Sequence, residues 1–248
     1  MVISFLKQTR LQTGPDMFPK PVPPRISVII PALHEADRIN RTLDRIRSAD
    51  HRSQTEIIVV DGDPAETTLR AVVGPDITKI SAPAGRSIQM NAGAGVAGGD
   101  ILLFLHADTL LPETAVKSIS DVCRDPEIAG GAFDLAIDAP GPVFRVIEKT
   151  ASLRSRLTRI PYGDQAIFIK AVCFHELGGF SSIPIMEDID LMRRIKRRGY
   201  RIRFIAGPVK TDARRWEQDG VLYTTLRNWT LSTLFYAGVS PEKLKKYY

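Results

Sequence analysis

The chain has 248 residues, of which 44% are hydrophobic and 25% are charged, so it can bury the core of one large domain or of one domain with an appendage. Its 34 Lys and Arg residues exceed its 28 Asp and Glu residues by six, which suggests anionic partners such as nucleotide phosphates, an anionic membrane surface or nucleic acid. No segment offers the roughly 18 uncharged apolar residues that a membrane-spanning helix needs.

The N-terminus and the cysteines indicate a cytoplasmic setting. The opening residues, MVISFLKQTR, contain too short an apolar stretch for a signal peptide. Cys123 and Cys173 lack the CxxC spacing of a zinc site, so we expect reduced thiols.

Residues 1–25 are expected to form an extended arm, because they contain five prolines and little periodicity. From residue 26 onward, runs rich in Ile and Val alternate with helical patterns. The expected strands are residues 26–30, 56–60, 77–81, 101–105, 130–137 and 165–172. This alternation predicts an α/β fold with a mostly parallel sheet flanked by helices.

Helical patterns separate these strands. Ile39, Leu43 and Ile46 recur at i, i+4 and i+7, as in an amphipathic helix. Further helices are expected over residues 86–97, from Pro112 onward and around residues 141–160.

Residues 93–98, GAGVAG, match the G-x-G-x-x-G pattern of dinucleotide-binding enzymes, but their context argues against that function. The pattern has to follow a strand, open a helix and precede an acidic residue by about 20 positions. Here it closes a helical stretch and precedes a strand, and Asp100 and Asp108 come too soon.

Acidic residues follow three of the expected strands: Glu35, Asp61 and Asp108. Each is compatible with a helix cap or a turn. If the strands are parallel, all three share one edge of the sheet, where ligands bind in such folds. Clustered carboxylates repel one another unless a cation or hydrogen-bond donors lie between them, so a divalent metal with a phosphate ligand is expected there.

His106 lies two residues before Asp108 in an extended segment, so both side chains point the same way and can approach one cation. Carboxylate suits Mg²⁺ or Mn²⁺, and imidazole moves the preference toward Mn²⁺ or other transition ions. A buried histidine bonded to the backbone is the alternative.

Four motifs, taken in order, resemble the family 2 nucleotide-sugar glycosyltransferases, which have the GT-A fold. They are SVIIPALHEADRI, IIVVDGD, FLHADT and MEDIDLMRRIKRRG, within residues 26–212. The segments GRSIQMNAGA and RRWEQDG are similar to those of small bacterial members that are sometimes associated with arsenosugar or selenium genes. FLHADT stands where the family has its Asp-x-Asp metal motif, with His106 in place of the first aspartate.

The resemblance implies roles for individual residues. The nucleotide would contact Pro31, Ala32, Leu33, Glu35, Asp61 and Ala107. Asp188 would be the general base, with Glu187 as its neighbour or as a ligand of the acceptor. Gly163, Asp164 and Gln165 would contact the acceptor or the donor sugar.

Basic residues supply two further candidates. Arg86 stands at an expected helix start, where backbone amides and a guanidinium suit phosphate, although a solvated arginine is the alternative. Arg214, Arg215 and Trp216 either close over the diphosphate or form a cationic surface patch.

Residues 221–239 place Leu222, Leu226, Trp229, Thr233 and Tyr236 at helical spacing, while Arg227 and Asn228 argue against a membrane span. Two interpretations stay open. The helix packs on the domain or at a homodimer interface, or it lies at a lipid surface on the inner face of the membrane together with the tail KLKKYY.

We therefore expect a GT-A domain over residues 26–212 and a helical extension over residues 213–248. The expected activity is metal-assisted, inverting transfer of a sugar from a UDP- or GDP-sugar to a hydroxyl acceptor. A sugar nucleotidylyltransferase is the first alternative, but its glycine-rich basic loop after the first strand is missing. A non-catalytic protein that binds anionic surfaces is the second. Nucleic acid is not an expected partner, because many of the basic residues lie on helices whose acidic residues balance their charge.

Overall fold

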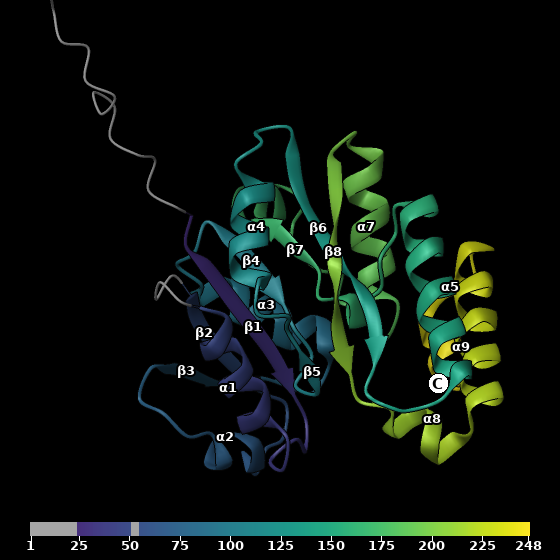
Figure 1. Ribbon diagram of the computed structural model, residues 1–248, viewed down its shortest axis with the longest axis horizontal. Coiled ribbons are helices and arrows are strands. Elements are labelled where there is room, and N and C mark those ends of the chain that lie inside the picture. Colours follow the sequence, from purple (N-terminus) through teal and green to yellow (C-terminus); the bar gives the residue numbers. More distant parts are fainter. Residues whose placement is uncertain (1–23, 51–54) are drawn as a thin grey trace, which may run out of the picture.

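The computed structural model describes residues 24–50 and 55–248. Most of the arm expected over residues 1–25 lies outside this part. The described chain forms an eight-stranded sheet with the order β3-β2-β1-β4-β7-β6-β8-β5, covered by helices (Figure 1). The C-terminal helices lie at the side of the molecule that also carries α5 (Figure 1).

The four parallel strands expected in the first half are confirmed. They are β1 (Ile26–Ala32), β2 (Thr55–Asp61), β3 (Ile77–Ser81) and β4 (Ile101–Phe104). The helices here are α1 (Ile39–Ala49), α2 (Thr67–Ala71) and α3 (Arg86–Val96). Ile39, Leu43 and Ile46 of α1 are fully buried, as their spacing predicts.

The second half is less regular. Its elements are β5 (Thr109–Leu110), α4 (Ala115–Cys123), β6 (Ile128–Ile137), α5 (Pro142–Thr158), the 3₁₀ turn η1 (Gly163–Gln165), β7 (Phe168–Lys170), α6 (Ala171–Glu176), α7 (Glu187–Arg197) and β8 (Arg201–Thr211). The helices α8 (Arg214–Asp219), α9 (Val221–Tyr236) and α10 (Pro241–Lys245) follow. Pro112 begins the turn that leads into α4.

In this half one expectation was wrong and one strand was missed. Only residues 168–170 of the expected strand 165–172 form a strand, because the segment starts within η1 and ends within α6. The longest strand, β8, was not predicted, because exposed Arg and Lys side chains and the pair Gly207-Pro208 interrupt its apolar pattern. It is held by parallel pairing with β6 and by antiparallel pairing with β5.

The core lies on both faces of the sheet. Val28 and Ile30 of β1 face one cluster together with Leu43 of α1, and Ile29 faces the other together with Met90 of α3. This alternation follows from the two-residue period of a strand. Both cysteines are free and buried, and burial raises the pKa of Cys123 to about 11.

The glycine pattern at residues 93–98 has a packing role. A Cβ atom on Gly93 would lie 2.5 Å from Cγ2 of Ile29 and 3.1 Å from Cγ2 of Val60, so this glycine lets α3 lie close against β1 and β2. Gly93 thus packs against side chains of the sheet, as expected for a structural glycine outside a dinucleotide site.

Within the described ranges, no helix is both long enough and apolar enough to cross a bilayer.

Candidate active site

A cavity of about 620 Å³ lies where β1 and β4 end, and α7, α8 and α9 add residues to its wall. Fourteen of the seventeen predicted site residues line it. They are Pro31, Ala32, Leu33, Glu35, Arg86, His106, Ala107, Asp108, Gly163, Asp164, Asp188, Arg214, Arg215 and Trp216. The structure therefore brings together the motifs that the sequence places far apart.

Asp61 is one of the three predicted residues that do not line the cavity, and its contact with the nucleotide stays a prediction. Its side chain is fully buried. The carboxylate accepts hydrogen bonds from the backbone N–H groups of Asp63, Thr68 and Leu69, at 2.9–3.2 Å. Asp61 thus holds the start of α2, which is the cap role considered as its alternative.

Gln165 also has a structural position. Its amide donates to the carbonyl of Phe133, and its Oε1 accepts from the hydroxyl of Ser155 and the N–H of Tyr162. These bonds use the polar atoms of a side chain that is fully buried. The contact between Gln165 and the acceptor or the donor sugar stays a prediction.

Glu187 lies behind the cavity wall, where it pairs with Arg86. Its Oε1 is 2.8 Å from Nε of Arg86, and its side chain is 3% exposed compared with 34% for Arg86. Burial raises the pKa of Glu187, and the positive charge of Arg86 partly offsets this increase. Glu187 therefore fixes Arg86 at the start of α3, and does not reach the cavity itself.

Asp188 is held at the first turn of α7 and lines the cavity. Met186, with a φ of 66°, turns the chain into this helix in the left-handed conformation that non-glycine residues rarely adopt. The carboxylate of Asp188 accepts from the N–H of Gly163 at 2.6 Å and from the N–H of Ile189 at 2.7 Å. Both bonds hold the carboxylate in a fixed orientation.

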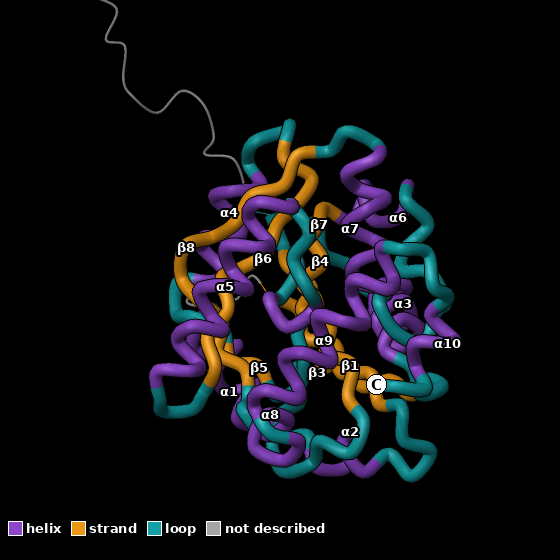
Figure 2. Tube along the Cα trace, turned by 90° about the vertical axis from the view of Figure 1, so that its right-hand side faces the viewer, coloured by secondary structure: helices purple, strands orange, loops and turns teal. Residues whose placement is uncertain are grey.

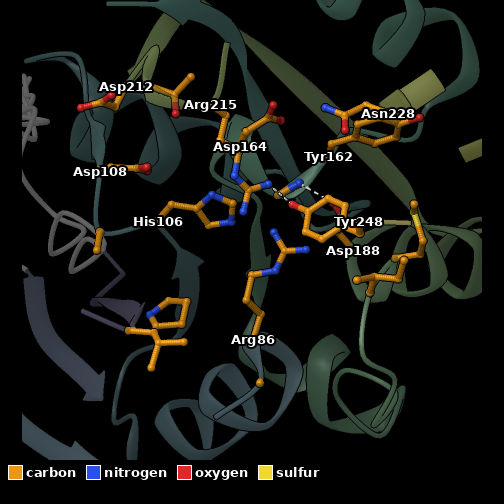
Figure 3. Close-up of a pocket in the computed structure, with 18 of the residues that line it drawn as sticks. Arg86, His106, Asp108, Tyr162, Asp164, Asp188, Asp212, Arg215, Asn228 and Tyr248 are labelled. Atoms are coloured by element: carbon orange, nitrogen blue, oxygen red, sulfur yellow. Dashed lines mark hydrogen bonds between the residues drawn. The ribbon is translucent and has the colours of Figure 1, made fainter. Parts of the chain in front are cut away.

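Two cations, Arg86 and Arg215, face His106. Figure 3 shows His106, Arg86 and Arg215 directed toward one space, with the ring of Tyr248 beside them. Arg215 donates to the hydroxyl of Tyr248, whose ring centroid is 5.9 Å from the guanidinium carbon of Arg86. Desolvation, together with Arg86, lowers the pKa of His106 to about 4, so its imidazole is neutral at pH 7.

Asp108 and Glu35 share Arg214. The guanidinium is 2.9 Å from Oε1 of Glu35 and 3.8 Å from Oδ2 of Asp108. Oε2 of Glu35 is buried and has no hydrogen-bond partner in the described part of the chain. A ligand in this cavity could satisfy it.

The metal expectation can be tested against the available donors. Within residues 24–50 and 55–248, no group of three or more His, Cys, Asp or Glu side chains could hold a metal ion. Mg²⁺ and Mn²⁺ often bind through one or two carboxylates, with phosphate oxygens and water as further ligands. The carboxylate of Asp108 and the neutral imidazole of His106 fit an ion that binds together with a diphosphate.

Asp164 joins the cavity from η1. Desolvation raises its pKa to about 6, which Arg154 opposes and Asp188 reinforces. A carboxyl group that is partly protonated near neutral pH can donate as well as accept a hydrogen bond.

Sequence reasoning missed several lining residues, among them Asp212, Asn228 and Tyr248. Asp212 directly follows β8, so its signal was a polar residue at the end of a strand that was itself not predicted. The cavity positions of Asn228 and Tyr248 depend on the fold of the last three helices and had no sequence signal.

The fold and the cavity are those of a GT-A-like α/β protein, and comparison with known proteins identifies its family. The model of the family described as "Glycosyl transferase family 2" matches residues 27–183, so the chain belongs to this family and is a glycosyltransferase. The family membership leaves no support for a sugar nucleotidylyltransferase or for a non-catalytic binding protein.

Curated relatives carry the same description. The chain is 26% identical over 229 residues to a probable glycosyltransferase, YdaM, of Bacillus subtilis (strain 168), covering 79% of this chain and 51% of the relative. It is 27% identical over 124 residues to an uncharacterized glycosyltransferase of Mycobacterium tuberculosis (strain H37Rv), covering 48% of this chain and 42% of the relative. The chain thus spans about half the length of the curated relatives it matches.

Solved structures support the GT-A fold. The mannosyltransferase PcManGT of Pyrobaculum calidifontis, in complex with GDP-Man and Mn²⁺, has a TM-score of 0.58 at 24% identity, over 77% of this chain and 57% of that one. Residues 1–349 of TarS from S. aureus have a TM-score of 0.59 at 14% identity, over 90% and 69% of the two chains. A second TarS structure contains UDP and has a TM-score of 0.58 at 15% identity, over 76% of this chain and 60% of that one.

Proposed function

We propose that the chain transfers a sugar from a UDP- or GDP-sugar to a hydroxyl acceptor, with inversion at the anomeric carbon and with Asp188 as the general base. The observation that carries the proposal is that the fixed carboxylate of Asp188 and the guanidinium groups of Arg86 and Arg215 line the same cavity. A base and a cationic site for a leaving diphosphate are the two groups that a single displacement requires.

The donor would lie across the ends of β1 and β4. The loop with Pro31, Ala32 and Leu33 offers a surface for the base, and the unpaired Oε2 of Glu35 offers an acceptor for a ribose hydroxyl or a base N–H group. Arg86 and Arg215 would hold the diphosphate, as the donor set of a guanidinium favours phosphate oxygens. The complexes of the structural relatives with GDP-Man and with UDP support this class of donor.

Asp188 would accept the proton of the acceptor hydroxyl while the hydroxyl oxygen forms a bond to the anomeric carbon. The bond between that carbon and the diphosphate oxygen breaks at the same time, and the nucleoside diphosphate leaves with the electron pair. The N–H groups of Gly163 and Ile189 keep the carboxylate oriented for this step. One displacement on the face opposite the leaving group inverts the anomeric centre.

A divalent ion would be held by Asp108 and His106, and the Mn²⁺ of the mannosyltransferase structure supports this choice. When bound, such an ion supplies positive charge to the diphosphate. Arg214 would keep Glu35 and Asp108 in position through its contacts with both.

We further propose that residues 26–212 form the catalytic domain and that residues 213–248 form an extension that completes the cavity. This division is supported by Trp216, Thr224, Asn228, Ser232 and Tyr248, which lie in the extension and line the cavity.

Thermal shift with UDP, GDP and their sugars, each with and without Mn²⁺, tests the donor. We expect stabilisation by nucleotides of one base, increased by Mn²⁺; no stabilisation by any nucleotide would remove the proposal. Asp108→Ala is expected to lose the part of the nucleotide-induced thermal stabilisation that depends on Mn²⁺. Its matched variant, Asp188→Asn, is expected to keep nucleotide binding but to lose sugar transfer. Unchanged turnover of Asp188→Asn would show that Asp188 is not the base.

A further inference from the structure

A second cavity, of about 440 Å³, lies between α5 and α9 and joins the first. The two cavities share Tyr162, Asp164, Trp216, Asn228 and Ser232. The space between the two helices is therefore continuous with the site that contains Asp188, and we call it the α5–α9 groove.

The groove has apolar walls and a polar inner end. Leu135 and Ile147 line one side, and Trp229 and Tyr236 of α9 line the other. At the inner end, Nε1 of Trp216 and Oδ1 of Asn228 are buried and have no hydrogen-bond partner among the described residues.

These two unpaired atoms call for an explanation, because buried polar groups are nearly always hydrogen-bonded. One is a donor and the other is an acceptor. A hydroxyl group both donates and accepts, so a single alcohol at the inner end could satisfy both atoms. Such an alcohol would lie in the part of the groove that opens on the cavity of Asp188.

The helices α5 and α9 carry ten of the seventeen exposed large apolar side chains on the described surface, of which Trp229 and Tyr236 also line the groove. They are Val143, Val146, Leu153 and Leu157 on α5, and Leu222, Tyr223, Leu226, Trp229, Leu234 and Tyr236 on α9. Figures 1 and 2 show the two helices at the same side of the molecule. So large an apolar set on neighbouring elements marks an interaction surface.

The two helices and the groove between them suit a bilayer surface. Three of their five basic residues pair with acids, Arg145 with Glu148, Arg156 with Asp134 and Arg227 with Asp219, so their charge selects no partner. Large apolar side chains together with aromatic residues that have polar tips are features of a helix that lies at a bilayer surface. The apolar groove leads from this surface to the cavity of Asp188, so an amphiphile in a bilayer would enter it directly.

We propose that the α5–α9 groove is the acceptor subsite and that the acceptor is a lipid alcohol drawn from a bilayer. The hydroxyl lies at the inner end beside Trp216 and Asn228, and the apolar chain runs outward between α5 and α9. The reaction is the displacement already described: Asp188 takes the hydroxyl proton, the alcohol oxygen bonds to the anomeric carbon, and the diphosphate leaves. This assignment rests on the proposed function, whose donor site is tested separately.

The groove is tested with 1-alkanols from hexanol to decanol, titrated against the intrinsic fluorescence of the full chain. Trp216 and Trp229 are its two tryptophans, and both line the groove. Burial of a CH₂ group contributes about 0.8 kcal/mol, so the affinity should increase about fourfold for each added carbon. Ala151→Phe and Thr225→Phe, which fill the groove from α5 and from α9, should each abolish this dependence. An affinity that does not change with chain length, or that neither variant alters, overturns the inference.

The bilayer is tested with vesicles of phosphatidylcholine and phosphatidylglycerol whose acyl chains are brominated. Bromine quenches a tryptophan that contacts the chains, so emission should fall relative to unbrominated vesicles. The double variant Leu157→Glu and Leu222→Glu should weaken vesicle binding by more than about tenfold, because two exposed Leu side chains lose their burial in lipid.

Val73→Glu with Val172→Glu is the matched control, since both residues are exposed apolar side chains outside α5 and α9. Equal loss of binding in the two double variants would overturn the surface assignment. A stable dimer in light scattering that Leu157→Glu and Leu222→Glu dissociate, without vesicle binding, would assign the surface to a second copy. If nucleotides stabilise the protein but alkanols and vesicles do not bind, the acceptor assignment alone fails. If no nucleotide binds, the proposed function fails whatever the lipids do.

Discussion

The pair of Arg86 and Glu187 gives a stability prediction that is independent of turnover. Arg86→Met keeps most of the side-chain volume but removes the guanidinium that lies 2.8 Å from a carboxylate only 3% exposed. Removing one partner of a buried ion pair costs about 3–5 kcal/mol. In a chain of this size, 1 kcal/mol shifts the melting temperature by about 2–4 °C, so we expect a decrease of about 6–20 °C at pH 8.

The two partners should not be equivalent. Glu187→Gln leaves Arg86, whose side chain is 34% exposed and can be hydrated. Its cost should therefore be about 1.5–3 kcal/mol, the value of a charge-assisted hydrogen bond. The comparison of the two variants at pH 8, in the absence of nucleotide, separates the loss of a contact from the burial of an unpaired charge.

The cost of Arg86→Met should also depend on pH. Burial already raises the pKa of Glu187 above its ordinary value of 4.5, and loss of the guanidinium raises it further. The native variant then keeps a proton that the unfolded chain releases, so its stability falls as the pH rises above about 4.5. We expect the destabilisation at pH 5 to be smaller than at pH 8 by about 1–3 kcal/mol.

Urea denaturation followed by circular dichroism at pH 5 and pH 8 measures all three quantities. The reasoning is refuted if Arg86→Met and Glu187→Gln are equally destabilised at pH 8. It is also refuted if the cost of Arg86→Met is the same at both pH values, because Glu187 would then remain hydrated and ionised without its partner.

Three further predictions concern other residues of the sheet and the cavity. Gly131→Ala should lower the free energy of unfolding, measured in urea, by more than about 3 kcal/mol, since its Cβ would lie 1.9 Å from the carbonyl oxygen of Arg203. Gly95→Ala, in open space on α3, should instead raise it by about 0.5–1 kcal/mol. Equal effects would contradict the packing of β6 against β8. Desolvation raises the pKa of Asp164 from 3.8 to about 6, so the unsubstituted protein loses stability as the pH rises through that range. Asp164→Asn removes this loss and should raise the free energy of unfolding by about 1–3 kcal/mol at pH 8 and by little at pH 4. The same gain in stability at both pH values would contradict the raised pKa of Asp164. Tyr248→Ala should tighten the binding of UDP or GDP measured by calorimetry, since the hydroxyl of Tyr248 accepts a hydrogen bond from Arg215 that a phosphate would otherwise accept. Weaker binding would mean that Tyr248 holds Arg215 in position for the diphosphate.

The first half of the sheet could be predicted because local patterns determine it. Ile39, Leu43 and Ile46 need only one apolar face, and the strand that contains Val28 and Ile30 is apolar on both faces. In contrast, β8 depends on pairing with β6, some seventy residues earlier in the chain, and its own side chains alternate between exposed and partly buried positions with a break at Gly207-Pro208. A non-local strand of this kind leaves little trace in its own sequence.

The acids at the strand ends show the same limit within the site. Glu35 and Asp61 follow neighbouring parallel strands, and their sequence contexts do not distinguish a ligand from a cap. In the structure, the N–H groups of Thr68 and Leu69 turn toward Asp61 and satisfy it, while Glu35 keeps an unpaired oxygen at the cavity. Which acid is available to a ligand is thus decided by where the next helix starts.

His106 is the residue whose interpretation changes most between sequence and structure. From its neighbours alone it is a softer metal ligand beside Asp108. In the folded chain, burial is the main cause that lowers the pKa of His106; Arg86 and Arg215 add to this effect from distant segments, while Asp108 and Asp188 oppose it. A neutral histidine supplies one fewer negative charge than the aspartate that the family motif has at this position, so the centre is more positive without a metal. The arginines would then bind a diphosphate by themselves, and a divalent ion would add less to its affinity than it does where two aspartates have to be neutralised first.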